Sequence, residues 1–175
     1  LDTELAYARH YPSIHWLRSY SEYIEDVAAW WEKEAPEWSE ARTEAMTVLQ
    51  REERLQQIVK LVGPDVLPDT QRLILFVAEI LKDGFLTQSA YDEVDSYCSP
   101  ERQVALLRLI LMLYRRGRDL VHAGAPLVRL REMKCVPDVV RAKAAYGNDK
   151  LDELKALESR VNTELDALEK EYMKQ

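Results

Sequence analysis

Glycine is scarce in this chain, and each of its glycines stands alone. Only five occur in 175 residues, and none is followed by lysine: Gly63, Gly84, Gly117, Gly124 and Gly147. A phosphate-binding loop needs a glycine-rich turn followed by lysine and serine or threonine at the start of a helix. The sequence therefore contains neither a P-loop nor a dinucleotide-binding fingerprint, and any such loop would have to lie outside it.

Cysteine and histidine are too few and too scattered to indicate a metal or redox site. Cys98 and Cys135 show no CxxC or CxxH spacing, so we expect reduced, packed thiols rather than a disulfide framework. His10, His15 and His122 lack the spacing of a helical metal-binding pair or a zinc knuckle. No GxSxG motif is present either. We expect no metal and no catalytic residue in this chain.

No apolar run in the sequence is long enough to cross a membrane. The longest lies near residues 106–114 and is interrupted by Arg108, whereas a bilayer span needs roughly 20 apolar residues. Hydrophobic residues make up 47% of the chain and charged residues 31%, a composition typical of a soluble helical protein. The sequence predicts no direct membrane insertion.

The net charge of -7 is unevenly distributed. Residues 102–143 have 10 basic and 3 acidic side chains, whereas residues 1–101 have 9 and 20. The basic middle is either a surface for an acidic partner or a face neutralised by the chain's own carboxylates, and we favour the second. Nucleic acid is not expected as a partner, because the overall charge repels phosphate and few aromatic residues accompany the arginines at 115–118.

Hydrophobic periodicity predicts helices along most of the chain and no strand. Ser21 is expected to cap the first helix. A long second helix should begin at Trp38 and end at Gly63, and a third should end at Gly84. Ser99 should cap a helix over about 100–122, and further helices are expected over 127–133, from 137 onward and over 151–172.

The expected fold is all-α: a helical bundle with a long C-terminal helix packed on it. Residues 21–147 are assigned to the bundle and residues 148–175 to the C-terminal amphipathic helix, while residues 1–20 precede both. The last helix has a near-heptad apolar seam that must lie against another helix: Leu151, Leu154, Val161, Leu165, Leu168 and Tyr172. A break in the second helix at the polar stretch Gln50–Arg54 remains an alternative.

Two connections between helices are candidates for recognition. The turn Gly63–Thr70 has apolar Val66 and Leu67 between Asp65 and Asp69, stiffened by two prolines. Such a rigid knob is suited to pressing on a partner. The alternative interpretation is an ordinary connection between two helices, which the residues alone favour.

The second candidate is the irregular connection Phe85–Tyr97. Phe85, Tyr91 and Tyr97 offer an aromatic face on which a planar base could stack, with Gln88 to bond its edge. The alternative is that these rings plug the bundle. The residues alone favour that alternative about as strongly.

Several segments follow one another in an order and spacing that are specific when taken together. They are RHYPSIHWLRSYSEY at 9–23, the pair Trp30-Trp31, EAMTVLQREERLQQIVKLVGPDVLP at 44–68, FLTQSAYDEVDSYCSPERQ at 85–103, and the closing charged helix. This order resembles the C-terminal domain of the catalytic A subunit of archaeal and vacuolar-type rotary ATPases. The resemblance implies that the chain is a piece of a longer subunit and that residues 1–20 connect it to a nucleotide-binding domain.

The same resemblance implies two sets of site residues. One set would contact the rotor: Asp65, Val66, Leu67 and Asp69. The other would line the adenine side of the nucleotide: Phe85, Gln88, Ala90 and Tyr91. The implied cofactors are ATP or ADP with magnesium in the intact subunit, whereas none is expected on this chain alone. The implied partners are the central-stalk rotor subunits and the neighbouring B subunit, in the soluble cytoplasmic head, peripheral to a membrane across which protons or sodium ions move.

Two rival functions remain at this point. One is a stand-alone helical adaptor or coiled-coil interaction module that pairs with a partner through the seam of residues 151–172. The other is a small independent enzyme, for which the sequence offers no site signature.

Overall fold

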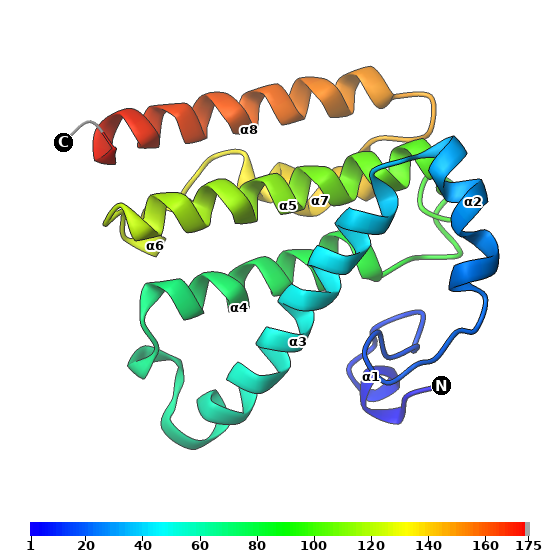
Figure 1. Ribbon diagram of the computed structural model, residues 1–175, viewed down its shortest axis with the longest axis horizontal. Helices are drawn as coiled ribbons and strands as arrows, with labels where there is room; N and C mark the ends of the chain where they lie inside the picture. The colour runs from blue at the N-terminus through cyan, green and yellow to red at the C-terminus, as the bar shows by residue number, and fades with distance from the viewer. Residues whose placement is uncertain (174–175) are drawn as a thin grey trace.

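A computed structural model describes residues 1–173, within which the chain forms helices and connecting segments but no strand (Figure 1). The α-helices are α1 (Thr3–Tyr7), α2 (Ile24–Glu34), α3 (Trp38–Val62), α4 (Asp69–Leu81), α5 (Pro100–His122), α6 (Leu127–Arg131), α7 (Val136–Ala145) and α8 (Leu151–Tyr172). A 3-10 turn, η1 (Pro64–Val66), precedes α4, and a π-turn, η2 (Lys82–Leu86), follows it. The all-α expectation is confirmed.

Helix α5 is the centre of the fold. It packs against α3, α4, α7 and α8, and Figure 1 shows it between α8 and α4. A helix that is apolar on several faces must be covered from several sides, and the buried residues of α5 include Leu106, Leu109, Ile110, Leu113 and Leu120. No helix within residues 1–173 combines the length and the apolar character needed to cross a bilayer.

The apolar seam of α8 is buried inside this chain. Its fully or nearly buried residues recur at intervals of three and four: Leu154, Leu157, Val161, Leu165 and Leu168. Helix α8 packs against α5 and α7, as the long C-terminal helix was expected to do. Because the seam is already covered, the adaptor hypothesis loses the surface on which it was based.

Two helix ends differ from the prediction. Ser21 does not cap α2, because its hydroxyl accepts the Tyr23 amide at 3.3 Å in a local turn and the helix starts after Tyr23. Gly84 does not end α4, because the α-helix stops at Leu81 and continues into η2. A Cβ on Gly84 would lie 3.1 Å from the Val140 carbonyl oxygen. Glycine therefore allows the close approach of α7 at this position, where a larger side chain would press on the Val140 backbone.

Helix α3 is unbroken through the polar stretch Gln50–Arg54. Within it, the buried carboxylate of Glu52 accepts hydrogen bonds from Lys82 Nζ at 2.7 Å and from Gln56 Nε2 at 3.0 Å. These bonds satisfy the polar group that enters the core. Helix α3 therefore does not need a break to bring the Glu52 carboxylate to solvent.

The excess of basic residues in α5 is neutralised by carboxylates of α3 and α8. The ion pairs are Arg115 with Glu44 at 2.6 Å, Arg108 with Glu158 at 3.1 Å, and Arg116 with Glu169 at 2.8 Å. The favoured interpretation of the charge pattern is confirmed for these arginines. Since each is already paired within the chain, they present little net charge to a partner.

Candidate functional site

Helices α3 and α4 form a hairpin whose tip is apolar and exposed. The two helices run in opposite directions and separate toward the turn that joins them (Figure 1). Leu61, in the last turn of α3, is 85% exposed, and Val66 in η1 is 68% exposed. Ile58 and Val62, which are close to Leu61 in the sequence, are also exposed. Exposed apolar side chains that gather in one place are typical of interaction sites, so this tip is a candidate for one.

The four residues predicted for this turn divide into two pairs. Asp65 and Val66 are exposed, whereas Leu67 is buried. The Asp69 carboxylate accepts the Leu127 amide at 2.8 Å, which joins the start of α4 to the start of α6. The structure thus leaves Asp65 and Val66 exposed at the turn. Leu67 and Asp69 hold the turn in place.

The second candidate is the connection Phe85–Tyr97, whose first two residues lie in η2. It is joined to the N-terminal residues by hydrogen bonds. The backbone amide of Gln88 donates to the Tyr11 carbonyl at 2.7 Å, and the Thr87 hydroxyl lies 3.0 Å from His10 Nδ1. Trp16, a few residues after Tyr11 in the chain, packs against the core. Residues 10–16 and the start of the connection therefore form one packed unit.

Inside this connection, the carboxylate and backbone of Asp95 organise the chain. Asp95 Oδ2 accepts the Ser89 amide at 2.7 Å, and the Asp95 carbonyl accepts the Gln88 side-chain amide at 2.9 Å. The Gln88 side chain, predicted to bond a base edge, is therefore engaged within the connection.

The predicted aromatic residues of this region face different surroundings. Phe85 is half-buried and lines a cavity of about 280 Å³ together with Trp16 and Trp38. Tyr91 and Ala90 are exposed, and Tyr91 is fully so. The structure therefore does not bring Phe85 and Tyr91 into one stacking face. It presents Ala90 and Tyr91 outward.

Sequence reasoning missed the residue that anchors this connection, Arg102. Arg102 is 0% exposed. Its guanidinium donates to the carbonyls of Val94 and Tyr97 at 3.0 Å each, and to the carbonyl of Lys143. One side chain of α5 thus joins the connection to the end of α7. The signal in the sequence was the helical spacing of Arg102 with the buried residue Leu106.

A buried ion pair lies in the same region. Lys143 Nζ is 3.2 Å from Asp95 Oδ1, and both side chains are about nine-tenths buried. Burial lowers the pKa of Lys143, and the neighbouring Asp95 carboxylate opposes that shift. Together with Arg102, this pair sets the geometry of the segment that presents Tyr91.

Histidines and cysteines form no metal site in the part of the chain that the structure describes. Residues 1–173 contain no group of three or more His, Cys, Asp or Glu side chains placed to hold an ion. His15 Nδ1 accepts the amides of Leu17 and Arg18 at 3.2 and 3.3 Å. Both cysteines are free, and burial raises the pKa of Cys135 to about 12 and that of Cys98 in the same direction. Both are packed thiols in which the raised pKa disfavours the nucleophilic thiolate form.

Comparison with known proteins bears on both candidate sites. A family model for the C-terminal domain of V and A type ATP synthase matches residues 28–129. The chain belongs to this family. The resemblance inferred from the ordered sequence segments is therefore confirmed.

Individual relatives of this ATP synthase domain extend the match over nearly all of the chain. The A subunit of the A-type ATP synthase of Ignicoccus hospitalis is 42% identical over 171 residues, 96% of this chain and 29% of the relative. The V-type ATP synthase alpha chain of Halothermothrix orenii is 43% identical over 98% of this chain and 29% of its own length. The corresponding A-type protein of Methanococcus vannielii is 50% identical over 82% of this chain and 25% of its own. The chain thus spans less than a third of the length of these relatives.

The matched segment of this ATP synthase domain contains both candidate sites. Residues 28–129 include the hairpin tip and the connection that presents Tyr91, together with the anchor Arg102. Helix α8 and the N-terminal residues lie outside it, although the relatives align with most of them. Both candidate sites therefore lie within the segment that the family model matches.

Proposed function

We propose that this chain transmits movement from the nucleotide-binding part of the catalytic A subunit of an ATP synthase to a rotating central stalk. In the complete enzyme, this movement would couple ATP synthesis or hydrolysis to the transport of protons or sodium ions. The observation that supports the proposal best is the exposed apolar tip of the hairpin, in a chain that belongs to this family. A rigid knob with Leu61 and Val66 outward is suited to pressing on a partner's surface.

Helix α4 is the element that can transmit such a movement. It has the hairpin tip at its start and η2, which leads to the Tyr91 connection, at its end. Its 13 residues form a rod about 20 Å long at 1.5 Å per residue. Asp69 fixes one end to α6, and Gly84 allows the other end to pack closely on α7. A displacement at one end therefore moves the other end with it.

The nucleotide itself would be held largely by residues outside this chain. In the intact protein, ATP or ADP with magnesium would bind at the P-loop that this sequence lacks, and Ala90 and Tyr91 would contact the adenine. Phe85 and Gln88 would support that segment from within. No residue of this chain is assigned a catalytic role. The partners would be the central stalk and the neighbouring B subunit, in a head that lies beside a membrane.

Substitution of both exposed tip residues tests the proposed transmission. Leu61→Asp combined with Val66→Asp should lower ATP turnover of the reassembled synthase at least tenfold, because two carboxylates cannot be desolvated against an apolar partner surface. Nucleotide affinity should stay within twofold, since both residues precede α4 whereas the connection with Tyr91 follows its other end. Turnover and equilibrium binding of a fluorescent ATP analogue measure the two effects.

The matched control for the tip variant is Met173→Asp, which replaces a partly exposed apolar side chain just after α8 by a carboxylate. It should leave turnover unchanged. Wild-type turnover in the double tip variant would rule out a mechanical role for the hairpin tip.

Substitution of Tyr91 tests the nucleotide contact separately. In the intact protein, Tyr91→Ala should weaken ATP binding by about 5- to 150-fold, the range given by roughly 1–3 kcal/mol for stacking of one base. Tyr7→Ala removes an equally exposed ring from α1 and should have no effect. Isothermal titration measures both affinities. Unchanged affinity after Tyr91→Ala would remove this residue from the pocket.

The isolated chain should bind ATP too weakly to measure at millimolar concentration. Stacking alone gives roughly 1–3 kcal/mol, whereas millimolar affinity requires about 4 kcal/mol.

A further inference from the structure

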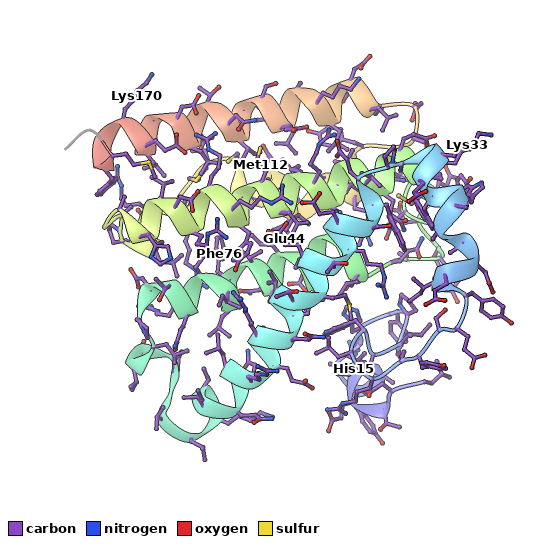
Figure 2. All side chains as sticks on the ribbon, viewed as in Figure 1. His15, Lys33, Glu44, Phe76, Met112 and Lys170 are labelled. Atoms are coloured by element: carbon purple, nitrogen blue, oxygen red, sulfur yellow. The ribbon has the colours of Figure 1, made fainter. Side chains whose placement is uncertain are left out.

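Helix α2 and Tyr23 just before it expose an apolar stripe that the rest of residues 1–173 leaves uncovered. No residue of α2 is buried. Tyr23, Val27 and Trp30 follow the i, i+4, i+7 spacing that places them on one face, and they are 72%, 39% and 49% exposed. The helix lies at the outer edge of the molecule, and Figure 2 shows Lys33 projecting from its far end.

The adjacent face of α2 holds this stripe in a fixed position. Trp31 stacks on Trp38 of α3 with ring centroids 4.5 Å apart and planes only 6° from parallel. Trp30 packs edge-on against Trp31 at 5.0 Å. The exposed Trp30 ring is therefore positioned before any partner arrives. An ordered tryptophan loses little conformational entropy on binding, which is typical of residues that dominate interface energies.

The charge around the stripe is strongly acidic and largely unpaired. Residues 22–37 include six carboxylates and one lysine. Among residues 1–173, Glu37 pairs with Arg108, whereas the other carboxylates form no ion pair: Glu22, Glu25, Asp26, Glu32 and Glu34. This differs from α5, whose arginines are neutralised by neighbouring helices. An uncompensated acidic rim around an apolar centre selects a partner with the opposite rim.

We propose that Tyr23, Val27 and Trp30 form a docking site for a neighbouring protein chain whose contact surface is apolar and bordered by lysine or arginine. Nucleic acid and anionic lipid are repelled by the acidic rim. A second copy of this face would place like charges opposite one another, which disfavours pairing with itself. The site relies on the proposed function only for the choice of assembly in which to test it.

Photo-cross-linking in the assembled synthase identifies the occupant. A benzophenone amino acid replaces Val27 in the full-length protein, and mass spectrometry identifies the peptide joined to it. The expected result is a peptide from a different subunit with lysine or arginine adjacent to apolar residues. A cross-link to the same polypeptide, to a second copy of it, or to an acidic segment would overturn the proposal.

Two variants measure the contributions of the stripe and the rim. Trp30→Ala should weaken incorporation of the full-length protein into the synthase by about 30-fold, the equivalent of a 2 kcal/mol interface residue. Glu25→Lys with Asp26→Lys should weaken it at least tenfold at low salt and less at high salt. Asp152→Lys, at a fully exposed carboxylate of α8, is the control and should change nothing.

Thermal unfolding of the same variants separates binding from folding. Since Trp30 is not part of the core, its loss should leave the melting temperature of the chain within about 2 °C of wild type. Normal incorporation of the Trp30→Ala variant would refute the docking site. The Leu61 and Val66 variants are tested by turnover rather than by incorporation. Failure of the docking site can therefore be told apart from failure of the role proposed for the hairpin tip.

Discussion

Replacing Arg102 by methionine should lower the free energy of unfolding by about 3 kcal/mol. The backbone carbonyls of Val94 and Lys143 would lose their side-chain donor, and that of Tyr97 would keep only the Asn148 side-chain amide at 3.3 Å. Each unsatisfied buried acceptor costs about 1–3 kcal/mol. Relief of the buried charge offsets part of this cost, because Arg102 and Lys143 are two cations near a single carboxylate, Asp95. The loss of three hydrogen bonds is the larger effect.

Urea denaturation of the purified chain measures this change, and limited proteolysis reports where it acts. The Arg102→Met variant should be cleaved faster within residues 87–99, since those residues lose their attachment to α5. Arg102→Lys should lower stability and speed cleavage about as much as Arg102→Met does. A lysine ammonium group cannot reach three carbonyls in the fixed geometry of a guanidinium. Arg118→Met is the control, as Arg118 is half-exposed and pairs with Asp119 on its own helix. A loss of less than about 1 kcal/mol for Arg102→Met would contradict the assigned role.

Ending the chain at Gly147 should abolish cooperative folding. The truncation removes five buried side chains of α8 and uncovers the faces of α5 and α7 on which they pack. At about 1.5–3 kcal/mol for each buried aliphatic side chain, the loss is about 8–15 kcal/mol, which is comparable to the total stability of a typical domain. Circular dichroism and size-exclusion chromatography should show an aggregated or partly helical chain.

The adaptor hypothesis predicts a different result for the same truncation, namely a folded monomer derived from a dimer. Leu165→Ala provides a milder version of the test, because Leu165 is completely buried. It should cost about 2–5 kcal/mol through lost contacts and a residual cavity. Ala156→Ser, on the exposed side of α8, should be nearly neutral. A stable, monomeric chain ending at Gly147 would contradict the assignment of α8 to the core.

The sequence predicted the long helices well because their apolar periodicity is strong. Helices α3, α5 and α8 match the expected segments, and Ser99 caps α5 through its hydroxyl as expected, accepting the Arg102 amide at 3.3 Å. Local signals failed where tertiary packing decides the conformation. Gly84 resembled a helix terminator, yet it lies within η2 and allows the close approach of Val140.

The candidate site was less predictable for a related reason. Exposure of Val66 and burial of Leu67 depend on how η1 turns over the start of α4, which no periodicity over two residues can reveal. Gln88 has donors and an acceptor that suit a base edge, but its side-chain NH2 group donates to the Asp95 carbonyl instead. The role of Arg102 depends on carbonyls up to 41 residues away. Such long-range polar contacts are set by the fold rather than by local pattern.

Site-specific cross-linking at Val66 is the sharpest test of the proposed contact between the hairpin tip and the central stalk. A benzophenone amino acid replaces Val66 in the full-length protein of the assembled synthase, with the same group at Met173 as the control. We expect a cross-link from position 66 to a protein of the central stalk, and none from position 173. Cross-links from position 66 only to other proteins of the head would contradict it.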